Sequence, residues 1–171
     1  MSELTAKVIA YLAREEGLCT EAYKDGGGVW TWALGVTDAS GHKVYPRYKD
    51  NPQDLQRCFD VSIWLIKERY LPAVLAAAPN LTEPQLAAAL SFHWNSGRFP
   101  KYANDFSKSV EIRNKGTLDA RRKREQDLYY KGVWPSLKCP IYPVSHSSYN
   151  PVFSKGQMID PLPYINKALH P

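Results

Sequence analysis

Two acids and a threonine stand close together near the start of the chain, at Glu16, Asp25 and Thr31. Two carboxyl groups can share acid–base work when their surroundings keep one protonated and the other ionised. Hydrolysis of a glycosidic bond needs such a pair, one group to protonate the leaving oxygen and one to direct water or attack the sugar. An ordinary glycine-rich turn with exposed acids explains the same spacing, so these residues alone leave both interpretations open.

The sequence around the two acids predicts different environments for them. Glu16 follows an amphipathic pattern and precedes the apolar residues Leu18 and Ala22, which would partly remove it from water. Asp25 precedes three glycines, 26–28, whose backbone N–H groups would favour its ionised form. The pattern therefore assigns the acid role to Glu16 and the ionised role to Asp25.

Helical spacing of apolar residues, together with capping signals, indicates a mainly helical chain around one small antiparallel sheet. Gly17 is expected to end the first helix, and Pro72 to kink or divide the second. The helices are expected at 3–15, 55–75, 82–96, 101–115 and 117–132, and the β-prone segments at 29–34 and 43–45. The caps are expected at Asn51, Thr82 and Thr117. The fold class is therefore α+β in two lobes, with a cleft between them as the natural ligand site.

The last part of the chain, residues 135–171, contains seven prolines but keeps many apolar residues. Its prolines exclude long helices, and its apolar content is too high for a free linker. We expect a single domain over 1–171, with a body over about 1–134 and a proline-rich tail packed on the helical lobe, where it would extend the substrate cleft.

Three blocks of the sequence resemble the phage-type lysozymes, the muramidases that tailed phages use as endolysins. The first runs from Glu16-Gly17-Leu18 through Asp25 to Trp30-Thr31, and Gly35 and Thr37 continue it. The second runs from Leu81 to Gly97, and the third contains Arg121-Arg122 with Glu125 and Leu128. In order and spacing the resemblance covers about residues 3–132.

This resemblance implies a lysozyme-like fold and a role for each matching residue. Glu16 would be the general acid, Asp25 would hold or activate the attacking water, and Thr31 would position that water. The substrate-binding residues would be Trp94, Asn95, Trp30 and Tyr23. Trp94 could equally be a core residue and Asn95 a helix-end residue before Gly97. We expect Trp30 and Trp32 to face opposite ways, one in the core and the other toward the cleft.

The family's reaction would be inverting cleavage of the β-1,4 bond between N-acetylmuramic acid and N-acetylglucosamine in peptidoglycan, with no cofactor and no metal. The partners would be glycan strands, with no nucleic acid and no membrane insertion, and the protein would be a monomer. The chain departs from the family at Ala33, which replaces a glycine, and at Val36, which replaces a histidine. Glu15, the other acid of the doublet, is assigned to solvent.

The net charge of +5 and the pI of about 9.0 favour anionic surroundings such as a cell wall or nucleic acid. The run Arg121–Arg124 is expected to be a solvated helix face, with a phosphate-binding patch as the alternative. Two rival functions follow, a non-catalytic wall-binding or virion tail component and a nucleic-acid-binding protein. A lytic transglycosylase is a nearer alternative, disfavoured by Asp25.

The first residues lack the pattern of a signal peptide, and no apolar stretch reaches a membrane-spanning length. We therefore expect accumulation in the host cytoplasm, followed by holin-dependent release to the wall or transport on a virion. Cys19, Cys58 and Cys139 have no paired spacing and are expected to be small buried apolar residues.

Overall fold

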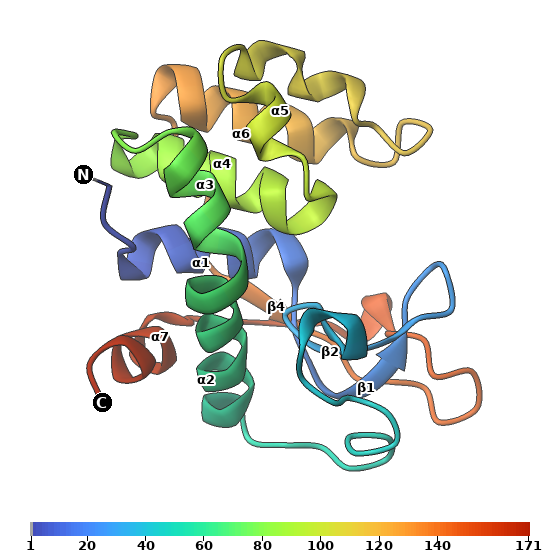
Figure 1. Ribbon diagram of the computed structural model, residues 1–171. Coiled ribbons are helices and arrows are strands. Elements are labelled where there is room, and N and C mark those ends of the chain that lie inside the picture. The colour runs from blue at the N-terminus through green and yellow to red at the C-terminus, as the bar shows by residue number, and fades with distance from the viewer. Residues whose placement is uncertain (1) are drawn as a thin grey trace.

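The computed structural model describes residues 2–171 and confirms the α+β class (Figure 1). A three-stranded antiparallel sheet with the order β1-β2-β3 lies beside a mostly helical part. The strands of this sheet are β1 (Cys19–Lys24), β2 (Trp30–Ala33) and β3 (Val36–Thr37). The helices are α1 (Ala6–Glu16), α2 (Leu55–Leu65), α3 (Leu71–Ala77), α4 (Glu83–Ser96), α5 (Phe99–Tyr102), α6 (Asp119–Lys131) and α7 (Leu162–Leu169).

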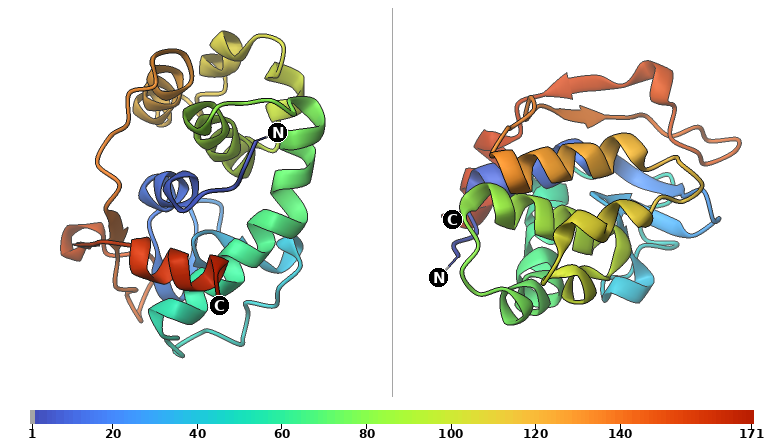
Figure 2. Two further views of the ribbon diagram at one scale, coloured as in Figure 1. Left: turned by 90° about the vertical axis from the view of Figure 1, so that its left-hand side faces the viewer. Right: turned by 90° about the horizontal axis from the view of Figure 1, so that it is seen from above.

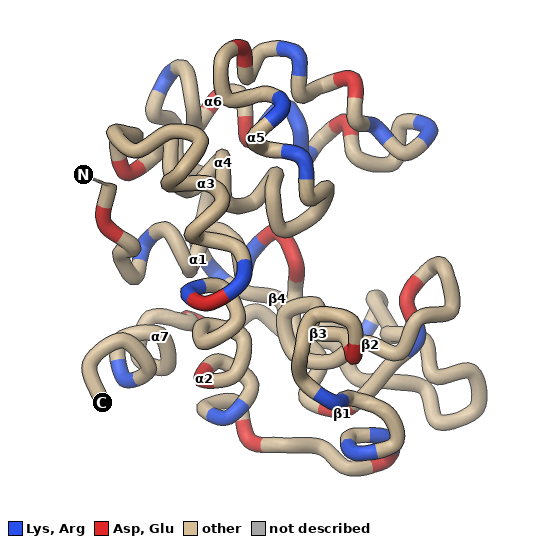
Figure 3. The backbone as a smooth tube through the Cα atoms, in the orientation of Figure 1, with Lys and Arg blue, Asp and Glu red and all other residues tan. Residues whose placement is uncertain are grey.

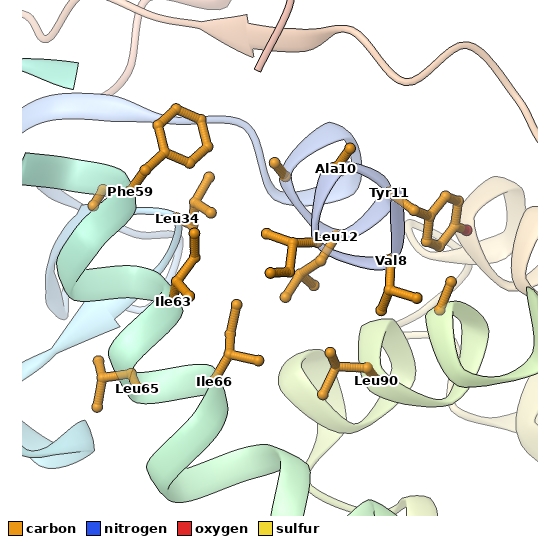
Figure 4. Close-up of a cluster of buried hydrophobic side chains, with 14 of the residues drawn as sticks. Val8, Ala10, Tyr11, Leu12, Leu34, Phe59, Ile63, Leu65, Ile66 and Leu90 are labelled. Atoms are coloured by element: carbon orange, nitrogen blue, oxygen red, sulfur yellow. The ribbon is translucent and has the colours of Figure 1, made fainter. Parts of the chain in front are cut away.

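Helix α1 lies at the centre of the core and carries Glu16 at its end. Thr5 caps its start by accepting a hydrogen bond from the Val8 N–H, and Gly17 ends it as expected, with φ 67°. Val8 and Leu12 point toward Leu90 of α4 and toward the side chains of α2 and the segment after it (Figure 4). Burial of this apolar face on several sides fixes the position of the helix end.

The second expected helix is divided at Pro72, as its sequence predicts. A π-helical turn, Ile66–Tyr70, separates α2 from α3, and the Leu71 N–H donates to the Ile66 carbonyl. Pro72 lacks an N–H and is tolerated in the first turn of α3, because the donors of a first turn have no intrahelical partner. Together α2, the π-helical turn and α3 form one long helical segment that connects the sheet to the helical part (Figure 1).

The helix expected at 101–115 was wrong. The chain instead forms the short α5 and a 3-10 helix, Phe106–Glu111, with a turn between them. Asp105 and Ser107 hydrogen-bond each other there, a local contact that competes with a regular helix. Phe106 and Ser109 are buried three residues apart, the period of a 3-10 helix.

Three other local expectations were wrong. The Val44 and Tyr45 N–H groups donate to the Asp38 carboxylate rather than to a strand. Helix α2 is capped by Asp54, not by the earlier Asn-Pro pair. Thr117 donates to a carbonyl of the preceding loop, and α6 begins after it. The cap at Thr82 and the end of α4 at Gly97 are confirmed.

The proline-rich tail contacts α1, α2 and the sheet. Its strands β4 (Cys139–Ile141) and β5 (Gln157–Ile159) form an antiparallel pair, and the Leu18 N–H donates to the Pro140 carbonyl at 2.9 Å. Helix α7 packs across α1 and α2, with Ile165 fully buried (Figure 2). Tyr164 stacks on Phe59 of α2 with ring centroids 5.7 Å apart.

Candidate active site

Glu16 is the last residue of α1, and its carboxylate is held by a side chain from α6. The Arg121 Nη1 donates to Glu16 Oε2 at 2.5 Å, and the Glu16 side chain is 16% exposed. The acid is therefore fixed on one side while part of it remains open to a ligand.

Asp25 and Thr31 lie at the end of the hairpin formed by β1 and β2. Asp25 Oδ1 accepts hydrogen bonds from the N–H groups of Gly27 and Val29, at 2.9 and 2.8 Å. These two donors hold the exposed carboxylate against its own turn. The Thr31 hydroxyl donates to the Val29 carbonyl at 2.9 Å, so its oxygen can still accept a hydrogen bond.

Tyr23 connects the two acids. It pairs with Thr31 across the β1–β2 ladder, so both side chains lie on the same face of the sheet. Burial raises the pKa of Tyr23, and the negative charges of Glu16 and Asp25 raise it further. Tyr23 lines a pocket of about 100 Å³ that contains Glu16 and a second pocket of about 520 Å³ that contains Asp25. Glu16 and Asp25 therefore line two adjoining pockets, here called the groove, that share Tyr23. Thr31 lines neither pocket and is only 5% exposed.

Arg121 is a site residue that sequence reasoning missed. It is buried and also donates to Glu125 of its own helix at 3.3 Å and to the Ser91 carbonyl of α4 at 3.0 Å. Burial opposes its charge, but Glu16 and Glu125 together raise the pKa of Arg121 above its ordinary value. The available signal was the spacing of Arg121 and Glu125, which puts the two charges on one helix face.

Both interpretations of the run 121–124 were wrong. Arg121 and Arg122 are 8% and 1% exposed, and Arg122 Nη1 donates to Glu125 at 2.5 Å. Only Lys123 is widely open to solvent, at 73%. Figure 3 shows acidic segments interleaved with the basic ones along the helical part. Arg121 and Arg122 belong to a buried ion-pair network with Glu16 and Glu125, so the run 121–124 is not a continuous basic surface of the kind that a nucleic-acid site needs.

The two residues expected at the cleft floor are placed differently. The Trp94 indole is half-buried, and its Nε1–H donates to the Leu34 carbonyl at 3.1 Å. It stands beside Gly35 and therefore close to Glu16. Asn95 is exposed, accepts a hydrogen bond from Arg122 and lines a separate pocket on the helical part. The structure brings Trp94 to the acid and Asn95 to a neighbouring site.

Trp30 lies on the opposite face of the sheet from Thr31. It stacks on Tyr45, with ring centroids 4.8 Å apart, and meets the edge of Tyr149. Trp32 is fully buried against Tyr48. The expectation that the two tryptophans point in opposite directions was wrong, because residues two apart in a strand share a face.

Gly35 is the point of closest approach between the sheet, Trp94 and Glu16. A Cβ on this residue would lie 3.1 Å from Trp94 Nε1 and 3.4 Å from Glu16 Oε1, and its φ is 111°. Both the space and the backbone conformation favour glycine.

Gly35→Ala is therefore expected to destabilise the protein by about 1–3 kcal/mol, the usual cost of a residue in a strained conformation. It should also slow any reaction that uses Glu16, because the new methyl group is too close to Trp94 Nε1 and displaces the indole that lies beside this carboxylate. Thermal unfolding and activity measure the two effects. Gly26→Ala, whose Cβ meets nothing within 4 Å, is the control for stability. Equal melting temperatures for the two variants would contradict the packing argument.

The comparisons with known proteins decide the family. A family model described as phage lysozyme matches residues 13–132. This chain belongs to the phage lysozyme family.

Several members of the family resemble this chain over part of their length. The SAR-endolysin of Escherichia phage 933W is 30% identical over 119 residues, which is 66% of this chain and 63% of the relative. A probable prophage lysozyme of Escherichia coli (strain K12) is 30% identical over 122 residues, with the same coverage. The chain therefore matches a little under two thirds of the length of these curated relatives.

Two solved structures of phage lysozymes share the fold. The endolysin from Escherichia coli O157:H7 phage FAHEc1 superposes with a TM-score of 0.59 at 22% identity, covering 80% of this chain and 98% of that one. A mutant of P22 lysozyme superposes with a TM-score of 0.53 at 19% identity, covering 75% and 99%. The expected lysozyme-like fold is confirmed.

The two departures from the phage lysozyme pattern both lie inside the sheet. Ala33, where the pattern has glycine, keeps a positive φ of 57° and is fully buried. Val36, where the pattern has histidine, is fully buried in β3 and pairs with Trp32. The backbone conformation suited to glycine is therefore retained at Ala33, whereas an apolar contact replaces a polar one at Val36.

Glu15 does not face solvent as expected. Its side chain is 2% exposed and accepts hydrogen bonds from Arg124, at 2.7 and 2.8 Å, and from the Tyr11 hydroxyl, at 2.6 Å. Burial alone would raise the pKa of Glu15, but the hydrogen bonds from Arg124 and Tyr11 lower it below its ordinary value of 4.5. Glu15 thus ties α1 to α6 beside the site.

Glu15→Gln is expected to lower the free energy of unfolding by about 1–2 kcal/mol at pH 7. This is the usual contribution of a charged hydrogen bond, reduced because Arg124 is partly exposed to solvent. Because the folded pKa is lowered, the stability that Glu15 supplies is fully present above about pH 4.5 and disappears as the pH falls through the folded value. In urea unfolding of the unchanged protein and Glu15→Gln, the difference between their free energies of unfolding should shrink from pH 7 to pH 3. A difference independent of pH would contradict this account.

The three cysteines are buried and unpaired, as expected. Among residues 2–171, the helices are all too short or too polar to cross a lipid bilayer.

Proposed function

We propose that this phage lysozyme family member hydrolyses the β-1,4 bond between N-acetylmuramic acid and N-acetylglucosamine in peptidoglycan and lyses the host cell. The observation that carries this proposal is that Glu16 and Asp25 line two adjoining pockets that share Tyr23, Pro151 and Phe153. Two carboxylates in unlike surroundings, Glu16 paired with Arg121 and Asp25 bonded to backbone N–H groups, support this proposal, which requires Glu16 to bind a proton before it reacts.

In the proposed reaction Glu16 protonates the glycosidic oxygen as the bond to the sugar breaks. A water molecule donates one hydrogen bond to the Asp25 carboxylate and one to the Thr31 oxygen, which leaves a lone pair directed at the anomeric carbon. The Thr31 hydroxyl can take this part because its own proton is donated to the Val29 carbonyl. Water attacks from the opposite face and passes one proton to the Asp25 carboxylate, so the configuration is inverted. This course needs about 6.5–9.5 Å between the carboxyl groups.

Tyr23 and Trp94 are proposed as contacts for the sugar rings nearest the bond. Tyr23 lines both pockets, and Trp94 stands beside Glu16 with its polar N–H already occupied, which leaves its ring for apolar contact. Asn95 would contact a more distant part of the strand, from its own pocket on the helical part. Trp30, on the other face of the sheet, is proposed only as a support for the hairpin.

The positive net charge of +5 would speed association with an anionic wall. We propose a monomer whose partner is the glycan strand, with no nucleic acid and no membrane insertion. It would collect in the host cytoplasm and reach the wall after holin-dependent release.

The test is clearing of purified peptidoglycan from several wall chemotypes, with mass spectrometry of the fragments. Reducing muramic acid ends would establish the hydrolase, and anhydro-sugar ends would establish a lytic transglycosylase instead. Wall binding without cleavage by the folded protein would make it a binding component. The anomer that first appears, followed by NMR, tests inversion.

A further inference from the structure

The proline-rich tail forms one wall of the groove that contains both candidate catalytic acids. Pro151 and Phe153 line the pocket with Glu16 and also the pocket with Asp25. Figure 1 shows this part of the chain beside β1 and the hairpin. These residues lie outside the segment 13–132 that the family model matches.

Phe153 is a solvent-exposed aromatic residue in this wall of the groove. It is 70% exposed and touches the face or edge of Tyr142, with ring centroids 5.0 Å apart and planes at 78°. A large apolar ring exposed in a groove is available for a ligand rather than for the core. The negative face of an aromatic ring attracts the weakly positive C–H face of a sugar ring.

The wall is held rigidly next to Glu16. The Tyr142 ring fits between two glycines: a Cβ on Gly17 would lie 2.8 Å from it, and a Cβ on Gly156 would lie 2.6 Å from it. Gly17 directly follows Glu16, so the Tyr142 ring of the tail contacts the backbone next to the acid. A preformed surface loses little entropy on binding.

The loop before Phe153 is tied to the sheet on two sides. The Lys24 N–H donates to the Tyr149 carbonyl at 2.7 Å, and the Tyr149 hydroxyl donates to the Asp50 carboxylate at 2.9 Å. His146 contacts Glu21 of β1. These contacts position Asn150, an exposed residue that lines the same pocket as Asp25.

We infer that the tail supplies an additional saccharide-binding subsite, in which Phe153 stacks on one sugar ring of the glycan strand and the Asn150 amide binds its N-acetyl group. A glycan is the expected occupant because the subsite is continuous with the groove of Glu16 and Asp25. The inference rests on the proposed function for its ligand class. It assigns to residues outside the family match a part in substrate binding.

The experiment measures binding and cleavage separately. Dissociation constants for an N-acetylglucosamine hexasaccharide are measured for the full chain and for Phe153→Ala, Phe153→Trp and Met158→Ala. Met158 is the matched control, because it is another large exposed apolar residue of the tail, at 57%, and lines neither pocket. Peptidoglycan cleavage is followed for the same proteins.

Phe153→Ala should weaken hexasaccharide binding by about two- to tenfold, the usual worth of one aromatic contact. Phe153→Trp and Met158→Ala should bind like the unchanged protein. Cross-peaks of Asn150 and Phe153 in NMR spectra should shift when the sugar is added. Equal dissociation constants for Phe153→Ala and the unchanged protein would overturn the inference, as would a failure of the unchanged protein to bind the sugar while it cleaves peptidoglycan. Failure of the proposed function looks different, because the sugar would then bind with the same Phe153 dependence while no wall is cleaved.

Discussion

Replacing Glu16 by glutamine is expected to slow peptidoglycan cleavage by about 10²- to 10⁴-fold, the usual contribution of a general acid. Glutamine has the same shape and keeps an oxygen that can accept from Arg121, but it has no proton to give to the leaving oxygen. The folded structure should survive, because Arg121 retains its contacts with Glu125 and Ser91. Fragment release measured by mass spectrometry gives the rate, and circular dichroism checks the fold.

The neighbouring acid provides a matched control for this experiment. Glu15→Gln changes the same group one residue earlier, but Glu15 lies in the Arg124 contact and outside both pockets. At a temperature well below its unfolding transition, Glu15→Gln should keep most of the cleavage rate. Normal cleavage by a folded Glu16→Gln, together with loss in Glu15→Gln, would move the acid role to the other member of the doublet.

Arg121→Met is expected to destabilise the protein by about 3–5 kcal/mol, the usual result of removing one partner from a buried ion pair. Glu125 is fully buried, and burial raises its pKa against the opposing pull of Arg121 and Arg122. Without Arg121 that carboxylate loses one of its two cations, and Glu16 loses its only ion pair among residues 2–171. The melting temperature should fall by about 2–4 °C for each kcal/mol.

Lys123→Met is the matched control for Arg121→Met. It removes a cation from the same helix, but Lys123 is widely exposed and pairs only with Asp127 at the surface. Its effect should stay within about 0.5 kcal/mol. Arg121→Lys should fall between the two, because an ammonium group cannot reach Glu16, Ser91 and Glu125 together as the guanidinium does. If Arg121→Met unfolds at the same temperature as Lys123→Met, the network does not stabilise the site.

The sequence was sufficient to predict helix starts and ends where the residue that signals them and its hydrogen-bond partner are close together in the chain. Thr82 caps its helix, Gly17 and Gly97 end theirs, and Pro72 coincides with the division between α2 and α3. Each of these depends on hydrogen bonds within about one turn of backbone, which are formed whatever surrounds the helix. The expected helix at 101–115 failed because alternative local hydrogen bonds compete there with the helical ones.

The order and spacing of Glu16, Asp25 and Thr31 pointed to a site only through their resemblance to the phage-type lysozymes, because the spacing alone fits an ordinary glycine-rich turn equally well. The burial and ion pairing of Arg121 and Glu15 could not be predicted from the sequence. A charged side chain is buried only when partners from other elements neutralise it, and here those partners are 105 and 109 residues away along the chain.

The sequence by itself determined the helices with local caps, the α+β class and the positions of the candidate acids. Only the tertiary structure decided what surrounds those acids: an arginine from α6 on one side and a tail segment on the other. The physical reason is that the hydrogen bond from the Leu18 N–H to the Pro140 carbonyl and the packing of Tyr142 between Gly17 and Gly156 form only after distant parts of the chain have met. No pattern within the tail could show that Phe153 would lie beside Asp25.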